Sequence, residues 1–124
     1  MIDFNNANFL KLRPVDPASF QSQLQPLFVE GESIIAAFQS IRDYVVFTNK
    51  RIIAVNVQGI TGKKKDYSSL PYSKIQAYSV ETAGVFDIDS ELELWFSGLG
   101  KVKLEFVSQA DVAGIFRTIS GFVL

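Results

Sequence analysis

The stretch that decides the fold is residues 44–57, which read YVVFTNKRIIAVNV. Two runs of β-branched and aromatic residues flank Asn49-Lys50, and Asn tolerates the left-handed conformation that a two-residue hairpin turn requires. The turn predicts an antiparallel hairpin in which Phe47 faces Ile52. Both faces of this hairpin are apolar. We expect one face in the domain core, and the other covered by an N-terminal helix or by another subunit.

The same pattern of short strands and turns continues on both sides of this hairpin. Seven strands are predicted, at about residues 33–40, 44–48, 51–57, 63–68, 74–81, 91–97 and 101–107. Ser108 to Asp111 resembles a capping box, and the apolar residues that follow at helical spacing predict a C-terminal amphipathic helix. The β-rich domain is therefore expected to span residues 31–124.

The first thirty residues predict a different kind of structure. Asp16-Pro17 reads as a helix N-cap followed by Pro at the first helical position. Pro26 limits this helix to about two turns. An earlier apolar cluster precedes it, at Phe4, Phe9, Leu10 and Leu12. We assign residues 1–30 as a helical extension of the domain.

The last predicted hairpin presents the only Trp of the chain to solvent. Alternation of side chains puts Leu94 and Phe96 on the inner face and Trp95 on the outer face. A three-residue turn at residues 98–100 keeps this alternation and places Trp95 opposite Lys103. We expect Trp95 either to contact a partner or to be covered by the N-terminal segment or the Lys103 stem.

The outer face around Trp95 also carries charged residues. They are Glu91, Glu93, Lys101 and Lys103. A hydrophobic anchor with a charged rim is typical of a protein–protein interface. This face is the candidate oligomer interface.

Composition excludes most catalytic and metal-binding classes. The 124 residues contain no Cys and no His, so thiol nucleophiles, imidazole bases and the usual zinc ligands are absent. No spacing of the remaining polar residues assembles a nucleophile with a base and an orienting group. We therefore expect no enzymatic activity, no cofactor and no metal.

Charge and hydropathy restrict the partners. There are 12 basic and 13 acidic residues, so the net charge is −1 and gives no overall attraction to nucleic acid or anionic membrane. The longest apolar runs are about five residues, against roughly 20 for a membrane span. A cytoplasmic protein that does not bind nucleic acid is expected.

Two charged segments have alternative interpretations. Lys63-Lys64-Lys65 could contact phosphate groups, but a lysine run also protects an exposed edge strand, and we favour this structural role. Residues 87–91 contain three carboxylates, which could suggest calcium binding. Leu92 and Gly98 stand where an EF-hand needs Gly and Glu, so we expect a solvated acidic loop.

Several segments together resemble the bacterial PH-like (pleckstrin-homology-like) domain family over about residues 28–124. They are GESI at 31–34, FTNKRII at 47–53, LPYSKI at 70–75, and ETAG at 81–84 with the nearby Asp87 and Asp89. The resemblance implies a mainly β fold, a PH-like barrel of seven antiparallel strands in two nearly orthogonal sheets, capped by the C-terminal helix. It also implies a non-catalytic module that forms homo-oligomeric rings, notably pentamers.

Eukaryotic PH domains bind phosphoinositides through a basic loop between their first two strands. The corresponding loop here, residues 40–43, is short and carries Arg42 beside Asp43. Weak or no membrane binding is therefore expected. The sequence predicts a self-assembling interaction module whose ligand is not specified. The alternative is a peripheral domain that binds anionic lipid or a phosphate ligand through Lys63, Lys64 and Lys65.

Overall fold

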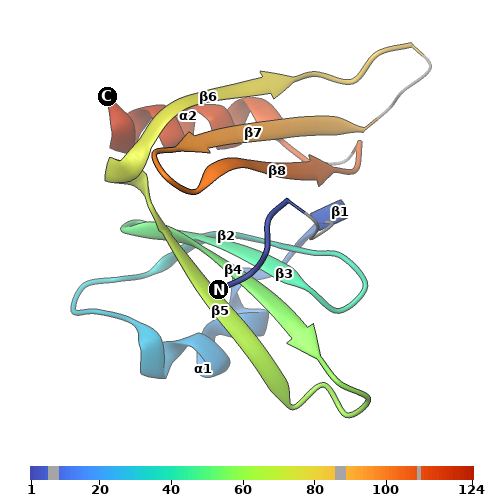
Figure 1. Cartoon of the computed structure of the whole chain (residues 1–124), viewed down its shortest axis with the longest axis vertical. Coiled ribbons are helices and arrows are strands. Elements are labelled where there is room, and N and C mark those ends of the chain that lie inside the picture. Colours follow the sequence, from blue (N-terminus) through green and yellow to red (C-terminus); the bar gives the residue numbers. More distant parts are fainter. Residues whose placement is uncertain (6–8, 86–88, 109) are drawn as a thin grey trace.

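The computed structural model describes residues 1–5, 9–85, 89–108 and 110–124. Eight strands are present: β1 Phe9–Val15, β2 Ile34–Gln39, β3 Tyr44–Thr48, β4 Arg51–Gln58, β5 Lys64–Pro71, β6 Ile75–Glu81, β7 Ser90–Phe96 and β8 Gly100–Phe106. The helical elements are η1 Pro17–Phe20, α1 Gln21–Leu24, η2 Gln25–Leu27, η3 Tyr72–Lys74 and α2 Val112–Val123. Figure 1 shows two layers of strands, with β2–β5 in one and β6–β8 in the other.

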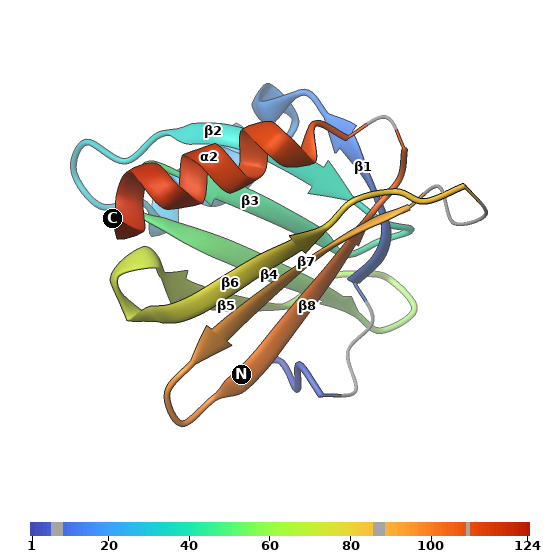
Figure 2. The same ribbon diagram turned by 90° about the horizontal axis from the view of Figure 1, so that it is seen from above.

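A single ladder runs through both layers in the order β5-β4-β3-β2-β1-β8-β7-β6. Strand β1 joins the layers, because residues 13–15 pair antiparallel with β2 while Phe9 and Leu12 pair parallel with β8. The strands of the two layers cross in Figure 2. The mainly β fold with a C-terminal helix is confirmed. The prediction of seven strands in two separate sheets that form a barrel is wrong in detail, since the ladder has eight strands and ends at β5 and β6.

Strand β1 was missed because its side chains do not alternate. Phe9 and Leu12 are both buried although they are three residues apart, and Leu10 is exposed between them. A bulge at this place, where Lys11 adopts a φ of +55°, turns both apolar side chains to the same core. Sequence patterns of period two cannot show such a strand. Residues 1–30 thus contribute a strand as well as helical turns, and the division at residue 30 stays a prediction.

The hairpin of β3 and β4 has the predicted register, with Phe47 opposite Ile52 and Tyr44 opposite Val55. One of its faces belongs to the main core, which includes Phe47. The other face packs against Phe20 and Leu24, and the rings of Phe20 and Tyr44 stack at a centroid distance of 3.9 Å. The N-terminal segment therefore covers the second apolar face, and no other subunit is needed for that purpose.

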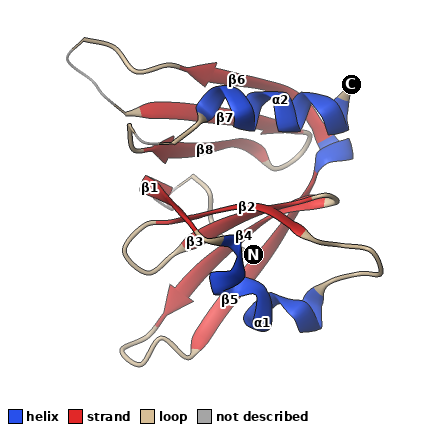
Figure 3. Cartoon of the chain, turned by 180° about the vertical axis from the view of Figure 1, so that it is seen from behind, coloured by secondary structure: helices blue, strands red, loops and turns tan. Residues whose placement is uncertain are grey.

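The N-terminal helical segment begins as the sequence predicted, but it consists of η1, α1 and η2 in succession and continues through Pro26 to Leu27. Asp16 accepts a hydrogen bond from the Ala18 backbone N–H at 3.0 Å, and Pro17 is the first helical residue. At the other end of the chain, Ile115 and Ile119 of α2 are buried in the main core. Figure 3 shows α1 against the β2–β5 layer and α2 along the layer of β6, β7 and β8.

The hairpin of β7 and β8 has the predicted loop length but a different register. The loop consists of residues 97–99, so Trp95 lies opposite Lys101 and not Lys103. Both registers keep the same side chains on the inner face, because they differ by two residues and the side-chain period is two. Alternation alone could not distinguish them.

Candidate functional site

The most prominent candidate site is the outer face of β7 and β8 around Trp95, which we call the Trp95 face. Its members are Trp95, Glu91, Glu93, Lys101 and Lys103. The Trp95 residue is 43% exposed, as the alternation predicted. Lys101 Nζ lies 5.5 Å from the centre of the indole ring, a cation–π geometry. The sequence predicted Lys103 opposite Trp95, with the Lys103 stem, the N-terminal segment or a partner as alternative covers of the indole.

The four charged residues of the Trp95 face form two ion pairs across the strands. Lys101 Nζ lies 3.9 Å from Glu93 Oε2, and Lys103 Nζ lies 3.3 Å from Glu91 Oε1. The two lysines are exposed and the two glutamates are half-buried, so water still reaches both pairs and each contributes little to stability. They do keep the charges around Trp95 balanced, which lowers the cost of covering the face with a partner.

Sequence reasoning missed the strand on the other side of Trp95. Ala77 of β6 pairs with Trp95 and is exposed, so its small side chain leaves that side of the indole accessible. In the described part of the chain, β6 pairs only with β7 and forms one end of the ladder. A partner at this end of the ladder can therefore contact both the indole on the outer face and the backbone groups of an edge strand.

The candidate anion-binding residues, Lys63, Lys64 and Lys65, lie at the opposite end of the ladder, at the start of β5. Lys63 and Lys64 are exposed at the start of β5, and Lys65 Nζ donates a hydrogen bond to the Gly62 carbonyl at 3.1 Å. Strand β5 is an edge strand of the described ladder, which fits the protective role of a lysine run. The structure also brings Arg42 of the β2–β3 loop to this turn, where its Nη1 donates to the Gly59 carbonyl at 2.7 Å.

The FTNKRII segment is a structural motif that holds residues 29–33 to the hairpin. The Glu32 side chain is fully buried and accepts from Arg51 Nε and Nη2, each at 2.9 Å, and from Thr48 Oγ1 at 2.7 Å. Asn49 accepts from the Ser33 N–H and donates to the Gly31 carbonyl. We call this cluster of Glu32, Thr48, Asn49 and Arg51 the Glu32 latch.

The protonation of Glu32 reflects these contacts. Burial acts to raise the pKa of its carboxyl, but the hydrogen bonds from Arg51, Thr48 and the Val29 N–H outweigh burial and lower the pKa below its usual value. An ionised carboxylate with all these partners stabilises the fold and is not available as a general acid or base. Tyr72 lies beside the latch and donates to the Thr48 carbonyl at 2.7 Å, and burial raises the pKa of its hydroxyl.

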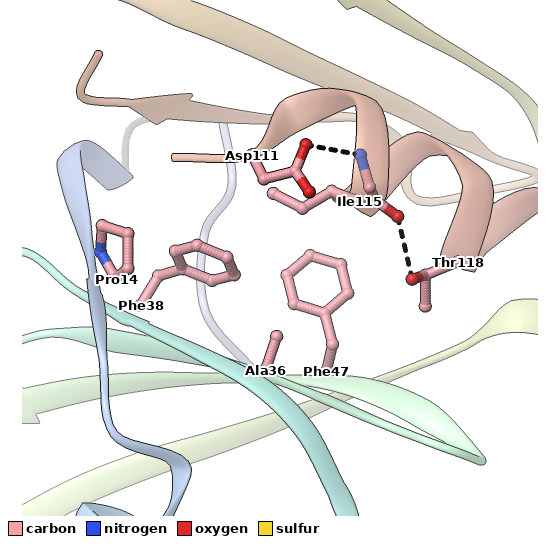
Figure 4. Close-up of a pocket in the computed structure, with 8 residues that line it drawn as sticks. Pro14, Ala36, Phe38, Phe47, Asp111, Ile115 and Thr118 are labelled. Carbon is pink, nitrogen blue, oxygen red and sulfur yellow. Dashed lines mark hydrogen bonds between the residues drawn. The ribbon is translucent and has the colours of Figure 1, made fainter. Parts of the chain in front are cut away.

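A cavity of about 360 Å³ lies between α2 and the β2–β3 hairpin (Figure 4). Its walls include Phe38, Phe47 and Ile115. Two polar side chains at its rim are already bonded within α2, since Asp111 accepts from the Gly114 N–H and Thr118 donates to the Gly114 carbonyl, both at 2.9 Å. The cavity offers an apolar surface without a polar group placed to react. No sequence signal pointed to it, because its walls come from distant segments.

Two further features concern the residues that the structure describes, 1–5, 9–85, 89–108 and 110–124. Within them, no group of three or more acidic side chains is placed to hold a metal ion. Asp87 of the acidic segment lies outside the described residues, and Asp89 forms an ion pair with Lys11. Of the helices in the described part, none is both long enough and apolar enough to cross a bilayer.

Comparison with known proteins identifies relatives over nearly the whole chain. Residues 3–123 match the family described as "Bacterial PH domain". The uncharacterized protein YjqA of Bacillus subtilis (strain 168) is 46% identical over 105 residues, which are 83% of this chain and 84% of that protein. The uncharacterized protein YozO of the same organism is 36% identical over 93 residues, which are 75% of this chain and 80% of that protein.

Solved structures of proteins with similar sequences also superpose on this chain. A protein of the DUF1696 family with a pleckstrin-homology domain, from Shewanella loihica PV-4, superposes with a TM-score of 0.82 and 42% identity. The match covers 93% of this chain and 99% of that chain. A pleckstrin homology domain from Shewanella amazonensis SB2B gives a TM-score of 0.69 and 42% identity over 89% of this chain and 90% of that one.

Proposed function

Because the chain belongs to the Bacterial PH domain family, we propose that it acts as a non-catalytic interaction module that assembles with copies of itself through the Trp95 face. The observation that carries this proposal is the exposed indole of Trp95 between Lys101 and the small Ala77. A large exposed aromatic side chain with a charge-balanced rim is the usual chemistry of an interface hot spot. A cytoplasmic location is part of this proposal.

The position of the Trp95 face also favours self-assembly. It lies beside β6, an end strand of the described ladder, so a second copy could add backbone hydrogen bonds to the contact with the indole. The alternative interface considered from the sequence, the second face of the β3–β4 hairpin, is covered by Phe20 and Leu24. This leaves the Trp95 face as the candidate for assembly.

We expect the interface to be head-to-tail, between the Trp95 face of one copy and a different surface of the next. Such a contact closes into a ring when its rotation divides the circle, and otherwise produces filaments. A ring of five is the size that the family resemblance implies.

Light scattering coupled to size-exclusion chromatography tests the proposal. We expect the unmodified protein to have the mass of a closed oligomer, and Trp95→Ala to reduce that mass while circular dichroism shows an unchanged fold. Ile60→Ala is a matched control, because it also removes an exposed apolar side chain, on the β4–β5 turn. A monomeric unmodified protein would refute the assembly, and a Trp95→Ala variant of full mass would exclude Trp95 as the anchor.

A second candidate function is the binding of an anionic ligand at Lys63, Lys64 and Lys65. The specific observation in its favour is the contact of Arg42 with the Gly59 carbonyl, which adds a fourth cation from another loop. Three adjacent lysines alone are more often a solvated edge, whereas cations gathered from separate segments are a more specific feature.

A further inference from the structure

A head-to-tail contact through the Trp95 face needs a different, complementary surface on the next copy. Trp95 stands near the C-terminal end of β7 and is 43% exposed. In Figure 2, this end of β7 lies on the opposite side of the molecule from β1 and the N-terminal part of α2, which border the cavity beside α2. The indole and the cavity of one copy therefore cannot meet, so a contact between them joins two copies.

The cavity has the size and the walls to accept an aromatic side chain. Its volume of about 360 Å³ is in the range of pockets that hold small ligands. The rings of Phe38 and Phe47 line it and meet edge to face, with their centroids 5.8 Å apart. Ala36 from β2 and Gly114 from α2 line it as well, and their small size leaves the space between the two elements open. Aromatic walls favour a further ring, because rings attract one another in edge-to-face and offset arrangements.

The side of α2 that faces β6 is filled by the chain itself. Tyr78 of β6 packs on Phe116 with the ring centroids 5.0 Å apart, and its hydroxyl shares a hydrogen bond with Ser120 Oγ at 2.7 Å. Tyr72 stacks on Phe122 with the centroids 4.7 Å apart. The opening beside α2 is thus on its β2 side, where small residues face each other.

The rim of the cavity carries an acceptor for an indole N–H, which needs a partner when it is buried. Asp111 Oδ1 accepts from the Gly114 N–H at 2.9 Å and caps α2. In the part of the chain that the structure describes, no hydrogen bond reaches the second oxygen, Oδ2. Figure 4 shows this carboxylate beside Ile115, at the cavity. A carboxylate oxygen is a strong acceptor for an N–H donor.

The edge of β2 beside the cavity favours a polypeptide as the occupant. Strand β1 pairs with residues 37–39 of β2, whereas Ile34 and Ala36 pair only with β3 in the described ladder. Ile35, between them, is 42% exposed. This part of the edge offers backbone groups next to a wall of the cavity. Another chain can bond to such groups, whereas a lipid tail cannot.

We propose that the cavity between α2 and the β2–β3 hairpin receives the Trp95 side chain of the neighbouring copy, with Asp111 accepting from the indole N–H. This inference rests on the proposed self-assembly and names its second surface. The indole of Trp95 combines a large ring with one donor, which suits aromatic walls with one free acceptor. Lys101, 5.5 Å from the centre of the indole, approaches Asp111 in this contact, so the charges at the rim are complementary.

Filling the cavity tests this inference separately from self-assembly. Ala36→Leu and Thr118→Leu fill it from two different walls, and Ala113→Leu is the matched control at an exposed position of α2. We expect the unmodified protein and the control to assemble, with a blue-shifted emission of Trp95 as the concentration rises. Both filling variants should weaken assembly by about thirtyfold or more and keep the emission of an exposed indole. Circular dichroism should show an unchanged fold.

A mixture of two variants tests the contact in a second way. Trp95→Ala keeps the cavity and lacks the indole, whereas Ala36→Leu keeps the indole and lacks the cavity. Each variant alone should be monomeric at concentrations where the unmodified protein is assembled. Light scattering of an equimolar mixture should give the mass of two copies, because one contact can form and neither end of the pair can extend.

Four results would count against the inference. Filling variants that keep full mass and a blue-shifted emission, while Trp95→Ala dissociates, would overturn the cavity as the acceptor and leave self-assembly in place. A mixture that remains monomeric would overturn it as well. Binding of dodecanoate that Ala36→Leu abolishes without a change in assembly would assign the cavity to an acyl chain instead. A monomeric unmodified protein would refute both the inference and the self-assembly on which it rests.

Discussion

Removal of the buried carboxylate of the Glu32 latch should cost the protein a large part of its stability. In Glu32→Ala, Arg51 loses two charge-assisted hydrogen bonds, and Thr48 and the Val29 N–H each lose a partner. The truncation of one partner of a buried ion pair costs about 3–5 kcal/mol. The Arg51 side chain is 22% exposed and keeps its bond to the Leu27 carbonyl, so water and this carbonyl offset part of the loss. We expect about 2–4 kcal/mol.

The assay is urea unfolding followed by far-ultraviolet circular dichroism at one protein concentration, because self-association would make the midpoint depend on concentration. Glu30→Ala is the matched control, since Glu30 is an exposed neighbour in the same segment. We expect a change of about 0.5 kcal/mol or less for this control. A loss below about 1 kcal/mol for Glu32→Ala would show that the latch does not hold the N-terminal segment, contrary to the reasoning above.

The latch also predicts a pH dependence with a definite sign. The pKa of Glu32 is lowered in the folded state, so its contribution to stability is fully present above the unfolded value of 4.5 and is lost as the pH falls through the folded pKa. The difference in stability between pH 7 and pH 3 should therefore be smaller in Glu32→Gln than in the unmodified protein. An equal difference in the two proteins would mean that Glu32 does not contribute to acid sensitivity.

Two further predictions concern the covered hairpin face and metal binding. Phe20→Ala should lower the free energy of unfolding in urea by about 3 kcal/mol, because it removes a buried ring stacked on Tyr44. Leu27→Ala should lower it by less than about 1 kcal/mol, because Leu27 is exposed. Equal losses of stability in the two variants would contradict the packing of this segment. Calorimetric titration with calcium and with zinc should detect no site tighter than about 100 μM, and a stoichiometric tighter site would overturn the expectation of a protein without metal.

Local sequence patterns suffice where a structural feature depends only on residues that are neighbours in the chain. The β3–β4 hairpin was predicted residue by residue, because Asn49-Lys50 fixes the turn and alternation fixes the faces. The N-terminal helical segment was predicted from Asp16-Pro17, since capping depends on neighbouring residues alone. The exposure of Trp95 followed from alternation in the same way. The identity of the lysine over the indole, Lys101 and not Lys103, could not be predicted in this way, because alternation does not distinguish registers that differ by two residues.

The candidate site was predicted in part for the same reason. The members of the Trp95 face belong to adjacent strands of one hairpin, so their common face could be read from the sequence. Ala77 was not included, because its place opposite Trp95 depends on the pairing of β6 with β7. Within the Glu32 latch, Glu32 lies 16 residues before Thr48, and only the packing of residues 29–33 on the hairpin brings them together.

The sequence by itself determined the mainly β class and seven of the eight strands. It also determined the helical segments near the two ends of the chain and the outward position of Trp95. Each of these follows from interactions between residues close in the chain, in which period, turn chemistry and capping act locally. Only the tertiary structure decided that β1 is a strand, that the second face of the β3–β4 hairpin is covered within the chain, and that Lys11 and Arg13 lie beside Arg42. These outcomes depend on packing between distant segments, where a bulge at Lys11 turns Phe9 and Leu12 to one core and so joins the two layers.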